Sequence, residues 1–244
     1  MNKCFYCNSL LLLSHYVDIY GNHCCKKHID SEDTVGYCSE CEKLIKKTGN
    51  VISDGRIICP DCMRIAVTPK RPFDWMLGQV VNRLQSYGFN DLNVNDITIW
   101  TATSQEMAAY KKSDVSIFNE GFCTIQTNGK IKIYVQSHHT KIHFAGVLAH
   151  ELLHAWCFKH DLLNIPPPIA EGMCNLASYC VYHSIDFPLA KIYEKQLFDD
   201  PDPIYGDGFR AMYEIYKDHG WDVVREIAVN SNQQLKYGIR KISR

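Results

Sequence analysis

The sequence lacks long hydrophobic runs, a charge excess of either sign and low-complexity segments. The apolar run at residues 10–13 is too short for a signal-peptide core or a membrane span. The formal net charge of −1 gives no general attraction to nucleic acid or to an anionic membrane. No secretory signal precedes the first cysteine pair, so we expect a cytoplasmic protein of one or two domains, without a membrane or nucleic-acid partner.

Cysteine, in contrast, is abundant at one end of the chain. Eight of the twelve cysteines lie between Cys4 and Cys62, and seven of these eight fall in C-x2-C or C-x2-H pairs. In a reducing compartment such pairs serve as metal ligands rather than as disulfides. The later cysteines stand in apolar stretches and are expected to be buried core thiols; they are Cys123, Cys157, Cys174 and Cys180.

The cysteine pairs form an internal repeat, because the two pairs of the first unit recur with the same gap between them in the second. Four soft ligands in two knuckles suit a tetrahedral structural zinc ion. About sixty residues bury little core, so the metal would supply much of the folding free energy. The simplest assignment gives one zinc to each unit: Cys4, Cys7, Cys25 and His28 in the first, and Cys38, Cys41, Cys59 and Cys62 in the second.

Two alternatives stay open for this module. The two units could interleave their ligands, and His23 or Cys24 could replace a ligand of the first unit. Residues 1–70 carry nine Lys/Arg and eight Asp/Glu, which gives weak electrostatic support for binding phosphates. We therefore expect the module to contact a protein partner or to position the second domain.

A proline-containing linker at residues 68–72 divides the chain into the module, 1–67, and a second domain, 68–244. In the second domain the pattern predicts a helix at 73–87 with Gly88 as its C-cap, and a strand at 97–103. Strands at 122–126 and 130–136 flank Asn128-Gly129, which suits a type I′ hairpin turn. A helix at 142–160, with Thr140 or Ser137 as N-cap, precedes helices at 169–183, 188–198, 209–217 and from 221 onward.

The helix at 142–160 contains an HExxH motif, in which His150 and His154 stand four residues apart. Residues at this spacing share one helix face, so both imidazoles can reach one metal ion. Glu151 is turned about 100° from His150, beside the metal, where it can take a proton from a bound water. The helix is apolar on nearly every other side, and a metal would satisfy its three polar groups.

A third ligand is needed, and three residues compete for the role. His160 fits a longer histidine pattern, but a helix that continues turns it about 120° away from His154. Asp161 meets the same objection. Glu171 is favoured, because it begins the helix that follows the triple proline, and Asn175 and Ser178 on that helix could bond to the ligands.

These motifs together resemble the plant LIM-domain zinc metallopeptidases that restrict organ size and are activated by ubiquitin, and their microbial relatives. The resemblance rests on the paired knuckles, on HELLHAW at 150–156, on Glu171 in EGMC, and on YGDGFR at 205–210. It implies His150, His154 and Glu171 at a catalytic zinc and Glu151 as the catalytic base. Two features differ: nine residues separate the two units, where a LIM domain has about two, and the first unit ends C-x2-H. The plant proteins also carry ubiquitin-interacting helices ahead of the LIM region, so ubiquitin activation is not carried over.

The segment 205–210 suggests a donor for the oxyanion of the transition state, with Tyr205 favoured over Arg210 and His219. The alternative is a glycine-rich turn that caps the next helix, with Asp207 near the cap. The strand at 130–136 directly precedes the HExxH helix; it could be an edge strand that aligns an extended substrate, or an ordinary hairpin strand.

The sequence thus predicts an α+β protein: a zincin-like metallopeptidase domain of helices and a small antiparallel sheet, behind a two-zinc LIM-like or zinc-ribbon module. The expected activity is that of a zinc metalloendopeptidase acting on protein or peptide substrates, with one catalytic and two structural zinc ions. Two alternatives are a zinc-binding adaptor with an inactive peptidase-like domain, and a DNA-associated protease.

Overall fold

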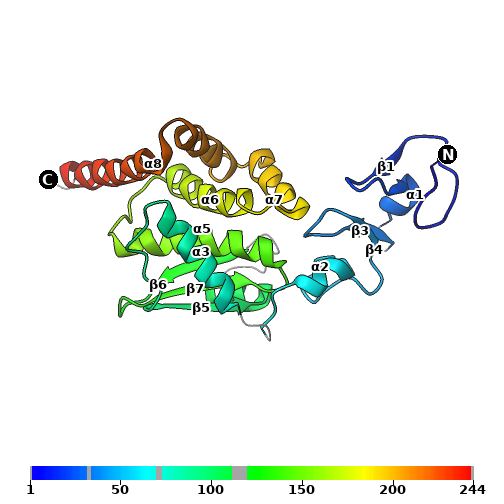
Figure 1. Ribbon diagram of the computed structural model, residues 1–244, viewed down its shortest axis with the longest axis horizontal. Helices are drawn as coiled ribbons and strands as arrows, with labels where there is room; N and C mark the ends of the chain where they lie inside the picture. Colours follow the sequence, from blue (N-terminus) through cyan, green and yellow to red (C-terminus); the bar gives the residue numbers. More distant parts are fainter. Residues whose placement is uncertain (1, 32–33, 70–72, 112–119, 243–244) are drawn as a thin grey trace.

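The computed structural model describes residues 2–31, 34–69, 73–111 and 120–242, so residues 70–72 of the predicted linker lie outside the described residues. The predicted boundary between two domains stays a prediction. Figure 1 shows the cysteine-rich units at one end of the molecule, the C-terminus at the other, and a helical layer over a small sheet between them. The α+β class expected from the sequence is confirmed.

The two cysteine units repeat in backbone as well as in sequence. The first contains β1 (His15–Val17), β2 (His23–Cys25) and the short helix α1 (Lys26–Ile29); the second contains β3 (Val35–Tyr37), β4 (Leu44–Lys46) and α2 (Pro60–Ile65). Asn8 and Glu42, at equivalent positions of the two units, both have a positive φ directly after a knuckle cysteine. Gly21 and Gly55, which are also equivalent, both have a positive φ in the following turn. The repeat therefore reflects one local fold used twice.

The sheet of the second part has three strands: β5 (Ile97–Ala102), β6 (Gly121–Ile125) and β7 (Ile131–Gln136). Its order is β5-β7-β6; β6 pairs antiparallel with β7, whereas β5 pairs parallel with it. The expectation of an antiparallel sheet is therefore wrong in part, because a crossover through α4 (Ser104–Lys111) and the following segment brings β7 beside β5 in the same direction. The expectation that β7 is an edge strand is also wrong, because it lies in the centre.

The hairpin between β6 and β7 forms where the sequence predicts it, but with a different turn. A type I′ turn needs a positive φ at both Asn128 and Gly129, and only Gly129 has one (77°). The Gly129 amide bonds to the carbonyl of Gln126, and the Asn128 side chain accepts a bond from the Lys130 amide. The asparagine thus stabilises a turn without adopting the left-handed conformation itself.

Helix α4 was not expected from its polar sequence. A capping box begins it: Glu106 accepts bonds from the amide and hydroxyl of Thr103, and the Thr103 hydroxyl accepts from the Glu106 amide. The T-x-x-E spacing in the sequence was the signal for this helix.

The remaining helices are α3 (Asp74–Ser86), α5 (Lys141–Lys159), α6 (Pro167–His183), α7 (Pro188–Asp199) and α8 (Gly206–Ile242). Thr140 caps α5 through a bond from the His143 amide, Pro167 begins α6, and Gly220 interrupts α8 with a positive φ of 76°. These elements agree with the sequence expectations. Helix α5 lies between the sheet and α6, and is buried along most of its length (Figure 1). This position puts the HExxH motif in the core.

The second cysteine unit packs directly on the helical layer. One hydrophobic cluster joins Cys38, Ile45 and Ile58 to Leu189 and Tyr193 of α7. The backbone at residues 66–67 also pairs with the residues just before α5, through the Val67 amide to the His139 carbonyl and the His138 amide to the Val67 carbonyl. The second unit therefore shares its core with the part of the chain that carries HExxH.

Candidate active site and metal centres

Both cysteine units gather their four ligand atoms. Within each unit the nitrogen or sulfur atoms lie within 4.8 Å of one another, and the sets are those of the sequential assignment: Cys4, Cys7, Cys25 and His28, and Cys38, Cys41, Cys59 and Cys62. In the first unit, His23 instead contacts His15, with 2.9 Å between their ring nitrogens. Both donor sets are consistent with zinc.

The two histidines of HExxH meet Glu171 across the interface between α5 and α6. Glu171 Oε2 lies 3.1 Å from His150 Nε2 and 3.3 Å from His154 Nε2, and the two nitrogens are 3.1 Å apart. All three side chains are partly exposed in the same cleft. The reversal of the chain at the triple proline is what brings Glu171 opposite the histidines.

Asn175 determines which atom of His150 faces this point. The Asn175 Nδ2 donates to the Tyr205 carbonyl over 3.2 Å, which turns Oδ1 toward His150 Nδ1 at 2.9 Å. His150 therefore carries a proton on Nδ1 and presents the lone pair of Nε2 to the Glu171 carboxylate. A lone pair and a carboxylate that face each other need a cation between them, so the donor set fits a metal ion such as zinc.

Glu151 lies on the other side of the helix turn, with its carboxylate against Gly121 of β6. A Cβ at Gly121 would stand 2.3 Å from Glu151 Oε1, so only glycine leaves room for it. Burial raises the pKa of Glu151, while His150 and His154 oppose this shift. A carboxylate with a raised pKa beside a metal ligand set is suited to accept and return a proton.

The rival third ligands lie elsewhere. His160 bonds through Nε2 to Asp91 at 2.7 Å and through Nδ1 to the Trp156 carbonyl at 2.8 Å. Its neighbour Asp161 has a positive φ at the turn after α5. Ser178 does not bond to the ligands as expected, because its hydroxyl donates to the Gly146 carbonyl at 2.8 Å and joins α6 to α5.

Cys174 is closer to the site than a core thiol would be. Its sulfur lies within 4.8 Å of the ligand nitrogens of His150 and His154. The side chain is fully buried, and burial raises its pKa well above the usual range. Cys174 is therefore a neutral thiol beneath the site, and Glu171 is the charged group that faces the cleft.

Tyr205 lines the cleft, as an oxyanion donor would, and is 44% exposed. Burial, then Glu171 and Glu151, raise the pKa of Tyr205 to about 12, so the phenol keeps its proton. Arg210 instead holds the loop before α8 together: it donates to the Phe198 and Asp200 carbonyls and pairs with Asp207. Neither Arg210 nor His219 lines the cleft as described.

The cleft has a volume of about 1120 Å³ and continues past the HExxH residues to a second polar cluster. Its wall includes Gly121, Phe122 and Cys123 of β6, an outer strand of the described sheet. At its far end lie Glu40, His139 and His143, whose ligand atoms are within 4.8 Å of one another. Sequence reasoning missed this group, although His139-x3-His143 directly precedes HExxH.

Comparisons with known proteins give a partial likeness. Protein DA1-related 2 of Arabidopsis thaliana is 25% identical to this chain over an alignment that covers 27% of the chain and 19% of that protein. No family model matches the chain, and no solved structure matches it. The chain thus shares one limited segment with a protein of the family that its motifs resemble. No helix among the described residues is both long and apolar enough to cross a membrane.

Proposed function

We propose that this protein is a zinc metalloendopeptidase that hydrolyses peptide bonds in protein or peptide substrates. The observation that supports it best is the meeting of His150 Nε2, His154 Nε2 and Glu171 Oε2 within 3.3 Å of one another, with Glu151 buried beside them in one cleft. His150, His154 and Glu171 would hold the catalytic zinc, and the cysteine units would each hold a structural zinc.

In this proposal, zinc held at the three ligands supplies Lewis acidity that polarises the scissile carbonyl and acidifies a water molecule. Glu151 accepts the proton of that water and delivers it to the leaving amine, which its raised pKa favours. Asn175 keeps His150 in the tautomer that presents Nε2. The Tyr205 hydroxyl, protonated at neutral pH, donates a hydrogen bond to the developing oxyanion.

An extended substrate would lie along β6 rather than β7. Strand β6 lines the cleft and has one partner strand among the described residues, so its outer edge can pair with a peptide backbone. The 1120 Å³ cleft has room for several residues of such a peptide.

Cleavage of a peptide library by the wild type and by Glu151→Gln tests the proposal. The expected loss in Glu151→Gln is about 10²- to 10⁴-fold in rate, with an unchanged zinc content, because the residue is a base and not a ligand. Tyr205→Phe should lose about 10²-fold in kcat, whereas Tyr110→Phe, outside the cleft, should match the wild type. Equal cleavage by wild type and Glu151→Gln would refute the peptidase.

We also propose a protein partner for the first cysteine unit. Leu12, Leu13 and Ile19 are 81%, 85% and 61% exposed, an apolar surface that a small zinc-stabilised unit does not need for its own fold. This surface also favours the second candidate function, an adaptor. Leu12→Ser/Leu13→Ser would then lose partner capture while peptide cleavage in solution persists, whereas cleavage that is absent in both proteins would favour the adaptor.

A further inference from the structure

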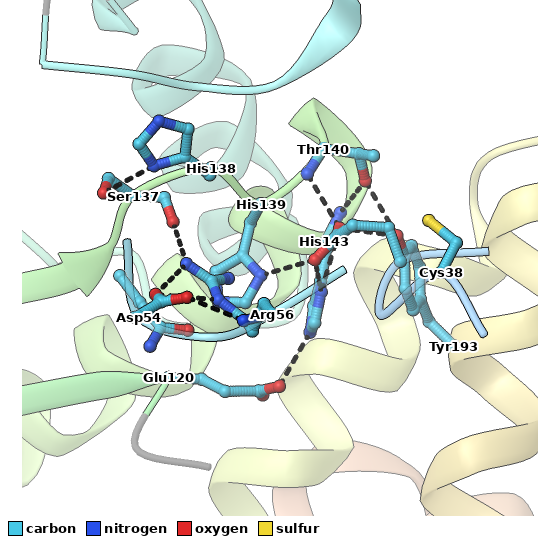
Figure 2. A network of polar contacts seen from close by, with 12 residues as sticks. Cys38, Asp54, Arg56, Glu120, Ser137, His138, His139, Thr140, His143 and Tyr193 are labelled. Carbon is cyan, nitrogen blue, oxygen red and sulfur yellow. Dashed lines mark hydrogen bonds and ion pairs between the residues drawn. The ribbon is translucent and has the colours of Figure 1, made fainter. Parts of the chain in front are cut away.

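A buried polar cluster connects the second cysteine unit to the helix that carries HExxH. Glu40 stands between the knuckle residues Cys38 and Cys41, while His139 and His143 stand at the start of α5. All three side chains of the cluster are at most 9% exposed. Figure 2 shows His139 and His143 side by side next to Tyr193 of α7.

The two oxygens of Glu40 have different partners. Oε2 accepts bonds from the Thr140 amide at 2.8 Å and from the Tyr193 hydroxyl at 3.0 Å. Oε1 lies 2.9 Å from His139 Nδ1 and 3.3 Å from His143 Nδ1. This is how a carboxylate that binds a metal through one oxygen is usually held, with its other oxygen hydrogen-bonded to the protein.

His143 has a carboxylate on each side. Its Nε2 lies 3.4 Å from Glu120 Oε1, the contact drawn at the bottom of Figure 2. An Nε2 proton donated to Glu120 leaves the lone pair of Nδ1 facing Glu40, and a carboxylate orients metal-bound histidines in this way. The His139 Nε2 is buried and has no hydrogen-bond partner in the structure, so nothing else determines which nitrogen of His139 faces Glu40.

The charges of the cluster call for a cation. Glu40 is buried and Glu120 is partly exposed, so with neutral imidazoles the group carries a net charge of −2, which is costly unless compensated. Separations of 2.9–3.3 Å between Glu40 Oε1 and the two nitrogens match those at the HExxH site, 3.1–3.3 Å. Two nitrogens and one carboxylate oxygen are ligands that zinc accepts, with the fourth position toward the cleft.

The geometry points to a further zinc site formed by Glu40 Oε1, His139 Nδ1 and His143 Nδ1, which joins the second cysteine unit to the HExxH helix. His143 precedes His150 by seven residues, which is two helical turns, so this site and the candidate catalytic site lie on one face of α5, about 10 Å apart along its axis. The metal fixes the start of α5 against the module. This inference does not depend on peptidase activity.

Zinc content per chain tests the site, measured by elemental analysis after passage over a chelating resin. We expect four zinc ions in the wild type, three in His143→Gln and in Glu40→Gln, three in His154→Ala, and two in His143→Gln/His154→Ala. Glu40→Gln keeps the length and most hydrogen bonds of the glutamate. His183→Gln, which replaces an exposed histidine outside both sites, should keep four.

Cobalt substitution separates loss of the site from loss of the fold. The thiolate-to-cobalt absorption of the cysteine units should be equal in wild type, His143→Gln and Glu40→Gln, since their ligands are unchanged, while one nitrogen–oxygen cobalt site disappears. Three zinc ions in the wild type, unchanged in His143→Gln and Glu40→Gln but reduced in His154→Ala, would overturn the inference and leave a protonated His143 between two glutamates. That outcome would not affect the proposed catalytic site, which is reported by His154→Ala alone.

Discussion

Asn175 offers a sharp test of how the candidate active site is assembled, because one side chain joins a proposed ligand to the oxyanion segment. Its Oδ1 accepts from His150 Nδ1 at 2.9 Å, and its Nδ2 donates to the Tyr205 carbonyl at 3.2 Å. In Asn175→Ala both bonds are lost. The His150 ring can then change its tautomer or turn, and its Nε2 lone pair no longer faces Glu171 in every molecule.

The magnitude follows from the role of such outer partners at metal sites. Their removal typically lowers metal affinity 10- to 100-fold, which is about 1.4–2.8 kcal/mol. The buried His150 is also left without a partner for its Nδ1 proton, which adds to the cost. We therefore expect Asn175→Ala to bind its catalytic zinc 10- to 100-fold more weakly and to cleave peptide more slowly even at saturating zinc, since the Tyr205 loop loses an anchor.

Competition with a chelator of known zinc affinity measures this effect once the cysteine units are filled. Ser178→Ala is the matched control on the same helix: its hydroxyl bonds to the Gly146 carbonyl, so it should lose about 1 kcal/mol of folding stability with unchanged zinc affinity. Asn175→Asp retains an acceptor for His150 and should recover most of the affinity. If Asn175→Ala binds zinc as tightly as the wild type, the argument about the tautomer is wrong.

Two further predictions concern close packing and buried charge. Gly121→Ala places a Cβ 2.3 Å from Glu151 Oε1; it should cost about 1–3 kcal/mol of stability and most of the peptidase activity, while the exposed Gly78→Ala in α3 should gain up to about 1 kcal/mol, both measured by denaturant unfolding. Asp54→Asn breaks a buried ion pair with Arg56 at 2.8 Å and should cost about 3–5 kcal/mol at pH 7. Burial opposes ionisation of Asp54, but the Arg56 contacts keep its pKa below the unfolded value, so its stabilisation is present above about pH 4 and lost as pH falls through the folded pKa. An Asp54→Asn deficit that persists undiminished at pH 2, in proteins with equal metal content, would contradict this assignment.

Local patterns were read correctly because their physics is local. The constant spacing of the cysteine pairs indicated the two units, and the structure repeats even the left-handed residues Asn8 and Glu42. The helix with HExxH, its Thr140 cap and the proline start of α6 also follow from spacing within a few turns. The turn at Asn128 was misread, because an asparagine–glycine pair fits more than one hairpin turn.

The order of amino acids is enough to define the ligand sets that lie close together in the chain: the cysteine pairs, and the two histidines on one face of a helix. Which distant residues meet them depends on the packing of the folded chain. That packing selected Glu171 over His160 by folding α6 back on α5, and it made β6 rather than β7 the outer strand in the cleft. It also brought Glu40 to His139, 99 residues away. Side chains so far apart meet only through the packing of whole elements, which leaves no periodic trace in the sequence.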